Sequence, residues 1–117
     1  MEEAVEKVII VEGKSDKKKV QEVINESVEI ICTNGTIGLS KLDELIDMLY
    51  DKEVFVLFDA DDSGDKLRKQ FKREFPEAKH IYIDRTYREV ASAPENHVAT
   101  VLLQANIQVH SKYLLQS

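Results

Sequence analysis

The stretch that most constrains this chain is an apolar run that ends abruptly in a group of acids. Residues 54–65 read VFVLFDADDSGD, so five consecutive apolar residues lead directly into Asp59, Asp61 and Asp62. A short apolar run that is rich in β-branched and aromatic residues predicts a buried strand, here over residues 54–58. In a parallel α/β sheet, ligands bind at the carboxyl ends of such strands. The acids therefore fall where a ligand is expected.

A bound cation would explain why three carboxylates gather at one strand end. Two carboxylates about 5 Å apart repel by roughly 3 kcal/mol at an effective dielectric near 20. The side chains offer only oxygen ligands, which predicts a hard ion, with Mg²⁺ or Mn²⁺ the best candidates. A solvated acidic turn without a ligand is the alternative that this stretch alone leaves open.

A second apolar run also ends in a carboxylate. Residues 7–12 read KVIIVE, and Gly13 follows Glu12 as expected where a chain turns sharply off a strand. If the two strands are parallel and adjacent, Glu12 and Asp59 project from the same edge of the sheet. Glu12 could then act as a general acid or base, because neighbouring carboxylates raise its pKa towards neutrality.

The remaining elements alternate between strand and helix. Alternation of this kind predicts right-handed crossovers and an α/β fold, with a compact sheet of about four mostly parallel strands flanked by helices. We expect Ser63 or Asp65 to cap the third helix, and Gly64 to ease the turn before it. Two further strands are expected at 28–32 and 79–84, and helices from Ser15 to about 25, from Ser40 to about 50, at 66–75 and from Pro94 to about 105, with 85–93 irregular.

Composition indicates one cytoplasmic domain. The 117 residues, 43% of them hydrophobic, predict a single domain over 1–117 with a proper core. The single cysteine, Cys32, is expected to be a buried thiol, and it indicates a reduced, cytoplasmic setting. No apolar run approaches the roughly 18 residues of a membrane span, so no membrane partner is expected.

Charge restricts how the chain could bind nucleic acid. A net charge of −6 argues against tight, metal-free binding to a phosphate backbone, but not against contact through bound cations. The best candidates for phosphate contacts are Gly13, Lys14, Lys66 and Lys69. The last two belong to the expected exposed face of the third helix, which carries Lys66, Arg68, Lys69, Lys72 and Arg73 and which could also be merely solvated.

Two short motifs carry a resemblance to a known family. VIIVEGKSD at 8–16, followed by FDADDSG at 58–64, resembles the Toprim domain over about residues 8–82. That family includes DnaG-type primases, topoisomerases, OLD-family nucleases, RecR proteins and a ribosomal-RNA maturase ribonuclease. The resemblance implies a compact Rossmann-like fold. The chain is most similar to the stand-alone small Toprim proteins, and the maturase ribonuclease is the nearest functional relative.

The resemblance also implies roles for individual residues. The family's glutamate and glycine match Glu12 and Gly13, its Asp-x-Asp pair matches Asp59 and Asp61, and the trailing glycine of the primase-like version matches Gly64. Asp16 corresponds to an aspartate that some primases carry.

These matches imply a Mg²⁺-dependent nuclease or phosphotransfer module that acts on nucleic acid, RNA or DNA with RNA favoured. Glu12 would be the acid/base and a metal ligand, Asp59 and Asp61 further metal ligands, and Asp62 an auxiliary ligand. Primase or topoisomerase activity by this chain alone is not expected, because the chain has no zinc module and no domain with a nucleophilic tyrosine.

Other functions compete with this hypothesis. A non-catalytic module could use the same metal to dock a nucleic acid or a protein partner, and a homo-oligomer would enlarge its binding surface. An acidic protein–protein adaptor would bind no metal. A haloacid-dehalogenase-type phosphatase also uses Asp-x-Asp after a strand, but normally after its first strand. An EF-hand is rejected because position twelve of the loop would be Gln70. His97 is more simply structural, although it could approach the acids.

Overall fold

Four parallel strands form a single sheet in this computed structural model, which describes residues 5–35 and 38–114. The strand order is β2-β1-β3-β4, and every neighbouring pair is parallel. This arrangement confirms the expected α/β fold with a parallel four-stranded sheet. The strands are β1 (Lys7–Val11), β2 (Val28–Cys32), β3 (Glu53–Leu57) and β4 (Lys79–Ile81).

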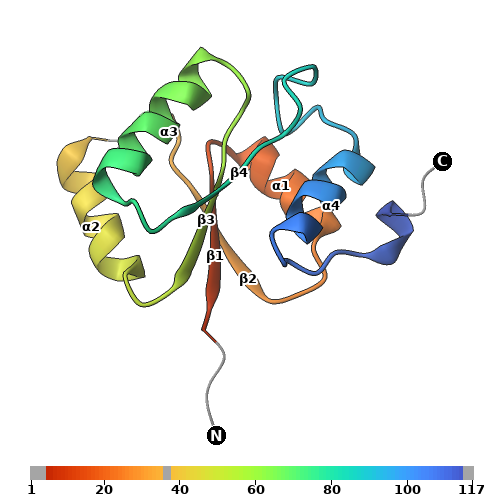
Figure 1. Cartoon of the computed structure of the whole chain (residues 1–117), viewed down its shortest axis with the longest axis horizontal. Coiled ribbons are helices and arrows are strands. Elements are labelled where there is room, and N and C mark those ends of the chain that lie inside the picture. The colour runs from red at the N-terminus through yellow and green to blue at the C-terminus, as the bar shows by residue number, and fades with distance from the viewer. Residues whose placement is uncertain (1–4, 36–37, 115–117) are drawn as a thin grey trace, which may run out of the picture.

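The helices cover both faces of this sheet (Figure 1). Two helices pack on each face, and each pair closes its own hydrophobic core. The sides are set by strand alternation: in β1, Ile9 belongs to one core and Ile10 to the other. Strands buried on both faces read as unbroken apolar runs. One face carries α1 (Lys14–Val23) and α4 (Glu95–Gln104), the other α2 (Leu39–Leu49) and α3 (Asp62–Glu74), and a short 3₁₀ turn, η1 (Ser111–Tyr113), lies near the end of the described chain.

Several helices begin earlier than the sequence predicted. The N-cap of α1 is Gly13 and not Ser15, because the Asp16 carboxylate accepts the Gly13 N–H at 3.0 Å. The N-cap of α3 is Asp61 rather than Ser63 or Asp65, since its Oδ1 accepts the Gly64 N–H at 2.8 Å. Aspartate and serine are both preferred caps, and Asp61, Asp62, Ser63 and Asp65 all lie within five residues, so the local sequence gave no way to choose among them.

The starts and ends of other elements also differ. Gly38, not Ser40, is the N-cap of α2. The third strand ends at Leu57, one residue before the predicted end, and β4 ends at Ile81 instead of continuing to residue 84. The last helix follows the prediction, with Pro94 as its N-cap and Ala105 as its C-cap.

Gly64 serves close packing rather than a turn. Its backbone φ is not positive, but a Cβ built on it would lie 1.9 Å from the Asp59 carbonyl oxygen. Only a residue without a side chain lets the first turn of α3 approach the end of β3 this closely. Gly64 therefore fixes the distance between the helix and the acidic loop of residues 59–62.

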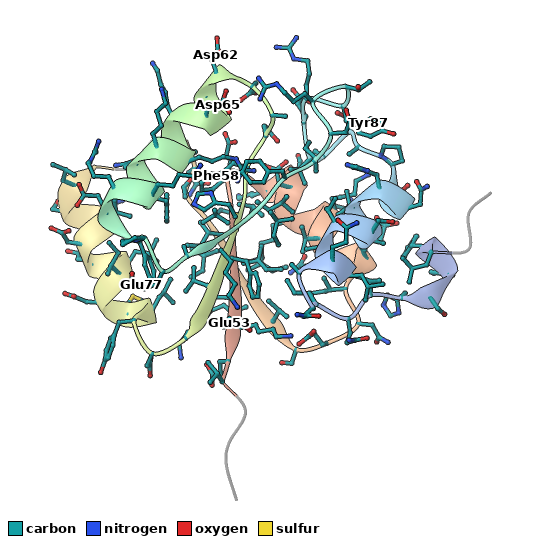
Figure 2. The ribbon with its side chains drawn as sticks, viewed as in Figure 1. Glu53, Phe58, Asp62, Asp65, Glu77 and Tyr87 are labelled. Carbon is teal, nitrogen blue, oxygen red and sulfur yellow. The ribbon has the colours of Figure 1, made fainter. Side chains whose placement is uncertain are left out.

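Arg68 was expected on the exposed basic face of α3, and this prediction is wrong. It is 5% exposed and lies on the inward stripe beside Leu67 and Phe71. Its guanidinium donates to the carbonyl oxygens of Phe58 at 3.2 Å and Ile81 at 2.6 Å. Arg68 therefore ties together the carboxyl ends of β3 and β4, which lie on the same side of the molecule as the start of α3 (Figure 2).

Two further expectations concern the cysteine and the membrane. Cys32 is half-buried and packs against the core of α1 and α4, so it is less enclosed than predicted. Within the described ranges 5–35 and 38–114, no helix has the length and apolar character needed to cross a membrane.

Candidate functional site

The acidic residues lie where the topology of the sheet changes direction. Strands β1 and β3 are neighbours, and the helices that follow them, α1 and α3, pack on opposite faces. In open α/β sheets, this switch point leaves a crevice at the carboxyl ends of the two strands. Glu12 directly follows β1 and Asp59 follows β3, and Glu12 Oε1 accepts the Asp59 N–H at 2.9 Å. The structure therefore brings the two predicted strand ends together.

Backbone amides hold the carboxylates of this edge in place. Asp59 Oδ1 accepts the Val90 N–H at 2.8 Å, in the same way that Asp61 binds Gly64 and Asp16 binds Gly13. Each bond engages one oxygen of its carboxylate. Hydrogen bonds from backbone N–H groups to a carboxylate are charge-assisted, so they orient the side chains before any ligand arrives.

Burial and mutual repulsion make these acids unusual. Burial raises the pKa of Asp59 to about 6, and the nearby carboxylates of Asp16, Asp61 and Glu89 add to the rise. The pKa values of Glu12 and Asp16 are also raised, mainly by burial. Groups with such perturbed pKa values in a crevice mark candidate functional sites.

The carboxylates of Glu12, Asp59 and Asp61, here called the acidic edge, do not form a preformed metal site. Among the residues that the structure describes, no three His, Cys, Asp or Glu side chains form a group that could hold a metal ion. The donor chemistry nevertheless fits a hard cation, because it consists of carboxylate oxygens whose ionised forms repel one another. Mg²⁺ in particular is commonly held by one or two carboxylates, with water and substrate phosphate completing its shell.

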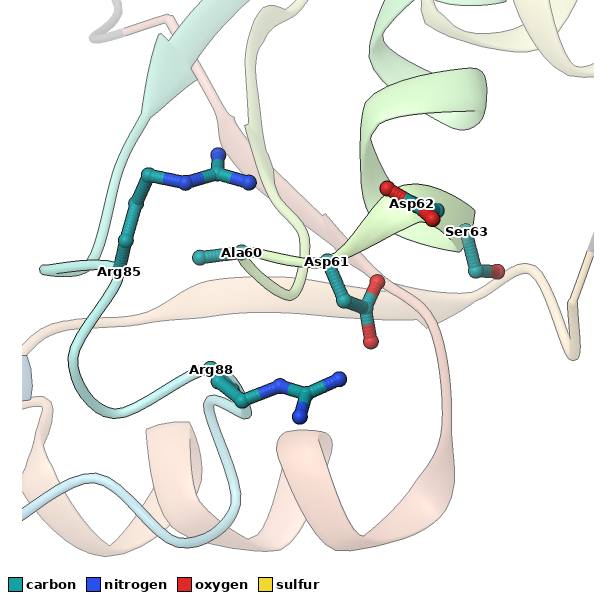
Figure 3. A pocket seen from close by; sticks show the side chains of 6 residues that line it. All are labelled: Ala60, Asp61, Asp62, Ser63, Arg85 and Arg88. Carbon is teal, nitrogen blue, oxygen red and sulfur yellow. The ribbon is translucent and has the colours of Figure 1, made fainter.

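The connection between β4 and α4, residues 82–94 and here called the β4–α4 loop, closes over the acidic loop. Its Arg88 carbonyl accepts the Ala60 N–H at 2.6 Å. Beside this contact lies a pocket of about 500 Å³ at the start of α3, with two arginines of the loop on one side (Figure 3). The pocket is lined by Ala60, Asp61, Asp62, Ser63, Arg85 and Arg88.

The predicted phosphate-binding residues are spread over two helices. Lys14 at the start of α1 is exposed, as are Lys66 and Lys69 on α3, and none of them lines the pocket. Gly13 has an extended backbone, φ −143°, that any residue can adopt, so the expected sharp turn does not explain this glycine. Among the described residues, a Cβ there would meet only the Asp16 carboxylate, at 3.9 Å. Packing within this part of the chain therefore does not require a glycine at this position.

Sequence reasoning missed part of the site. Asp16 is buried, 7% exposed, and with Glu89 it contributes to the electrostatics of the acidic edge. Glu89, Arg85 and Arg88 all lie in the segment expected to be irregular, which has no periodicity that could place them. Only the resemblance pointed to Asp16.

His97 is part of the frame of the β4–α4 loop. Its Nε2 accepts the Asp84 N–H at 2.9 Å, and its ring lies 4.8 Å from the ring of Tyr87. Lys19 secures the other end of the loop, since its ammonium group donates to the Ala93 carbonyl at 2.7 Å. These contacts favour the structural role considered for His97.

The fold and the acidic edge together define the class of protein. Residues 7–86 match the Toprim domain family, so the chain belongs to that family and the resemblance seen in the two motifs is confirmed. Family membership also sets aside the haloacid-dehalogenase alternative. A small TOPRIM domain protein from Bacillus stearothermophilus has the same fold, with a TM-score of 0.94 and 57% sequence identity over 98% of each chain.

Other relatives fall into two groups. The protein YusF of Bacillus subtilis, described as uncharacterized, is 62% identical over 94% of this chain and 75% of its own length. Ribonuclease M5 of Fusobacterium nucleatum is 33% identical over 73% of this chain and 46% of its own length. Ribonuclease M5 1 of Ligilactobacillus salivarius is 38% identical over 68% of this chain and 42% of its own length. The chain thus spans less than half the length of the ribonucleases that it matches.

Proposed function

We propose that this Toprim protein processes nucleic acid by metal-dependent hydrolysis of a phosphodiester bond, with RNA as the favoured substrate. The observation that carries the proposal is the junction of β1 and β3, where Glu12 accepts the Asp59 N–H and the pKa of Asp59 is raised to about 6. The similarity to proteins named Ribonuclease M5 supports RNA over DNA.

Asp59, Asp61 and Glu12 would hold the ion, Mg²⁺ or Mn²⁺, with Asp62 as an auxiliary group. When bound, such an ion supplies positive charge that offsets the charge of the phosphate. Asp61 also caps α3, so its carboxylate is presented at a helix N-terminus, where an anionic group is favoured. Lys14, Lys66 and Lys69 are exposed and could contact phosphates further along the chain of the nucleic acid.

Glu12 is the candidate acid/base. Burial and the neighbouring Asp59 and Asp61 carboxylates raise its pKa, which increases the share of Glu12 that carries a proton near neutral pH. A group whose pKa lies nearer the working pH transfers protons more effectively. The bond from the Asp59 N–H holds the Glu12 carboxylate at the junction of β1 and β3, where it could take up or release a proton at an approaching phosphate group.

A non-catalytic, metal-dependent binding module is the second candidate. One observation favours it: the match covers less than half the length of the proteins named Ribonuclease M5, so most of each ribonuclease has no counterpart in the matched part of this chain. Such a module would dock a nucleic acid or a protein partner through the same acidic edge. It differs from the first candidate in one measurable property, since it would retain its ligand without shortening it.

A cleavage assay separates the two functions. Labelled structured RNA, single-stranded RNA and DNA would be incubated with the protein in Mg²⁺, Mn²⁺ or EDTA, beside Glu12→Gln and Asp59→Asn. We expect metal-dependent products whose rate of formation falls at least about 100-fold with Glu12→Gln, in line with the loss of an acid/base group. Asp59→Asn should reduce the rate as well, because it removes the charge of a metal ligand. Asp43→Asn, on the exposed side of α2, is the matched control and should cleave like the wild type.

The assay has two outcomes that contradict cleavage. Intact substrates under every condition, with metal-dependent retention on a gel, would establish the binding module. Products that persist in EDTA, or in both site variants, would show that the acidic edge is not the reactive site.

A further inference from the structure

Two arginines share the pocket beside the acidic edge, and no motif identified them. We propose that Arg85 and Arg88 form a binding site for a phosphate group of a nucleotide, next to the carboxylates of the acidic loop. This inference deepens the proposed function, on which it rests, because it names the substrate group that the site holds and the residues that hold it. It depends on where the β4–α4 loop places the two guanidinium groups.

Hydrogen bonds fix the backbone of this loop on both sides of the arginines. Arg88 accepts the Ala60 N–H through its carbonyl, and the Val90 N–H binds Asp59. Across Arg85, the Asp84 carboxylate accepts the Thr86 N–H at 2.8 Å. The turn between them closes through an Arg88 N–H bond to the Arg85 carbonyl at 3.2 Å. The loop therefore holds the backbone of both arginines in a fixed position relative to the acidic loop.

Arg88 occupies a backbone position where an arginine is unexpected. Its φ is +61°, in the left-handed region that glycine and asparagine favour. Its side chain is exposed and makes no ion pair with any of the residues at 5–35 and 38–114. Neither the backbone nor internal packing explains this arginine, whereas a ligand in the pocket would.

Arg85 is almost as free. Its only ion pair within the described part of the chain is to Asp65, at 3.6 Å, and its side chain is 70% exposed. A pair this long and this exposed contributes little and exchanges readily for a better acceptor. Figure 3 shows both guanidinium groups reaching from the loop towards the side on which Asp61 lies.

The chemistry of the pocket suits a phosphate. A guanidinium group binds phosphate oxygens through two parallel N–H bonds, which a lysine cannot do. The pocket volume of about 500 Å³ lies within the range of pockets that hold small ligands. Among the residues that line the pocket, the two arginines match the two carboxylates of Asp61 and Asp62 in number of charges.

Binding measurements test this site separately from cleavage. Fluorescence anisotropy would follow labelled single-stranded RNA with Arg85→Gln, Arg88→Gln and the wild type, in Mg²⁺ and again in Ca²⁺, with a gel of each sample to detect cleavage. We expect the affinity to fall about tenfold in each variant and the salt dependence to become shallower by about one phosphate contact. Arg73→Gln removes the same charge from the exposed end of α3 and should bind like the wild type.

The source of the phosphate follows from two RNAs that differ only at the 5′ end. If the pocket holds an internal phosphodiester, the arginine substitutions weaken the binding of the 5′-phosphorylated RNA and of the 5′-hydroxyl RNA by the same factor. If it holds a terminal phosphate, the substitutions lower the affinity for the 5′-phosphorylated RNA alone, and free AMP competes with that RNA for the wild-type protein.

The inference is overturned if Arg85→Gln and Arg88→Gln, with unchanged melting temperatures, bind both RNAs within twofold of Arg73→Gln. It survives a failure of the proposed function, because arginine-dependent binding without any cleavage would support the phosphate site alone. Cleavage that requires Glu12 but is unchanged by substitution of either arginine would support the proposed function and contradict the phosphate site at Arg85 and Arg88.

Discussion

At the scale of single residues, Asp59 experiences two opposing effects. Its Oδ1 accepts the Val90 N–H at 2.8 Å, which favours the folded state. Its negative charge is partly buried among other acids, which disfavours the folded state and raises its pKa to about 6. Replacement by alanine would remove both effects and leave the Val90 N–H without its partner. Asparagine keeps the acceptor and removes only the charge.

We therefore predict that Asp59→Asn stabilises the metal-free protein at pH 7. Folding takes up a proton between about pH 4 and pH 6, because the pKa of Asp59 is about 6 when folded and near 3.8 when unfolded. The penalty for the charged form is thus absent below about pH 4 and complete above about pH 6. It corresponds to at most roughly 3 kcal/mol, reduced by solvent screening to about 1 kcal/mol for this half-buried group.

Urea unfolding of the wild type and Asp59→Asn between pH 4 and pH 8, in EDTA, measures this difference. The free energy of unfolding of the variant should exceed that of the wild type at pH 7 and converge with it near pH 4. A variant that is less stable at pH 7 would show that the charge of Asp59 is compensated inside the site.

At the scale of elements, the start of α3 sets the shape of the acidic loop. Gly64 lies where a Cβ would come within 1.9 Å of the Asp59 carbonyl oxygen, and the obstacle is backbone that cannot rotate away. We predict that Gly64→Ala lowers the free energy of unfolding by about 3 kcal/mol, even though alanine favours a helix over glycine by roughly 1 kcal/mol.

Thermal or urea unfolding measures this loss, with Gly38→Ala as the control. Gly38 is the N-cap of α2 and, like Gly64, has no positive φ. Among the described residues that are not its chain neighbours, no atom lies within 4 Å of a Cβ built there. Its replacement should cost less than about 1 kcal/mol. Equal stabilities of the two variants would mean that α3 can shift away from β3 without penalty.

The elements also show what the sequence could predict. The strands and the parallel sheet follow from runs such as 54–58, because strands that are buried on both faces must be apolar throughout. The positions of Glu12 and Asp59 follow from the same runs. The starts of α1 and α3 did not follow, since Asp16 and Asp61 cap through side-chain bonds that several neighbouring residues could equally have made.

The buried Arg68 and the β4–α4 loop illustrate a different limit. An arginine on a helix is normally exposed, and only the tertiary arrangement of the Phe58 and Ile81 carbonyls makes its burial favourable. Arg85 and Arg88 lie in a segment without periodicity, held by contacts to Ala60 and Asp59 that are distant in sequence. Such positions depend on the assembled fold and not on local pattern.

At the scale of the whole molecule, the net charge of −6 opposes binding to a polyanion. A protein that binds RNA through a basic surface loses affinity when Mg²⁺ is added, because the ion competes for the phosphates. We predict the reverse here: at constant ionic strength, Mg²⁺ should tighten RNA binding by roughly tenfold, or about 1.4 kcal/mol. The ion would offset the carboxylates of Glu12, Asp59 and Asp61 and so turn a repulsive edge into an attractive one.

Titration of labelled RNA with the protein, at several Mg²⁺ concentrations and with KCl adjusted to hold the ionic strength, measures this effect. Asp59→Asn should lose most of the Mg²⁺-dependent gain, whereas Asp43→Asn, which changes the net charge equally, should keep it. An affinity that falls with Mg²⁺ in all three proteins would place RNA binding on the exposed lysines of α1 and α3 and away from the acidic edge. A gain that is equal in all three would show that the ion acts on the RNA and not on the protein.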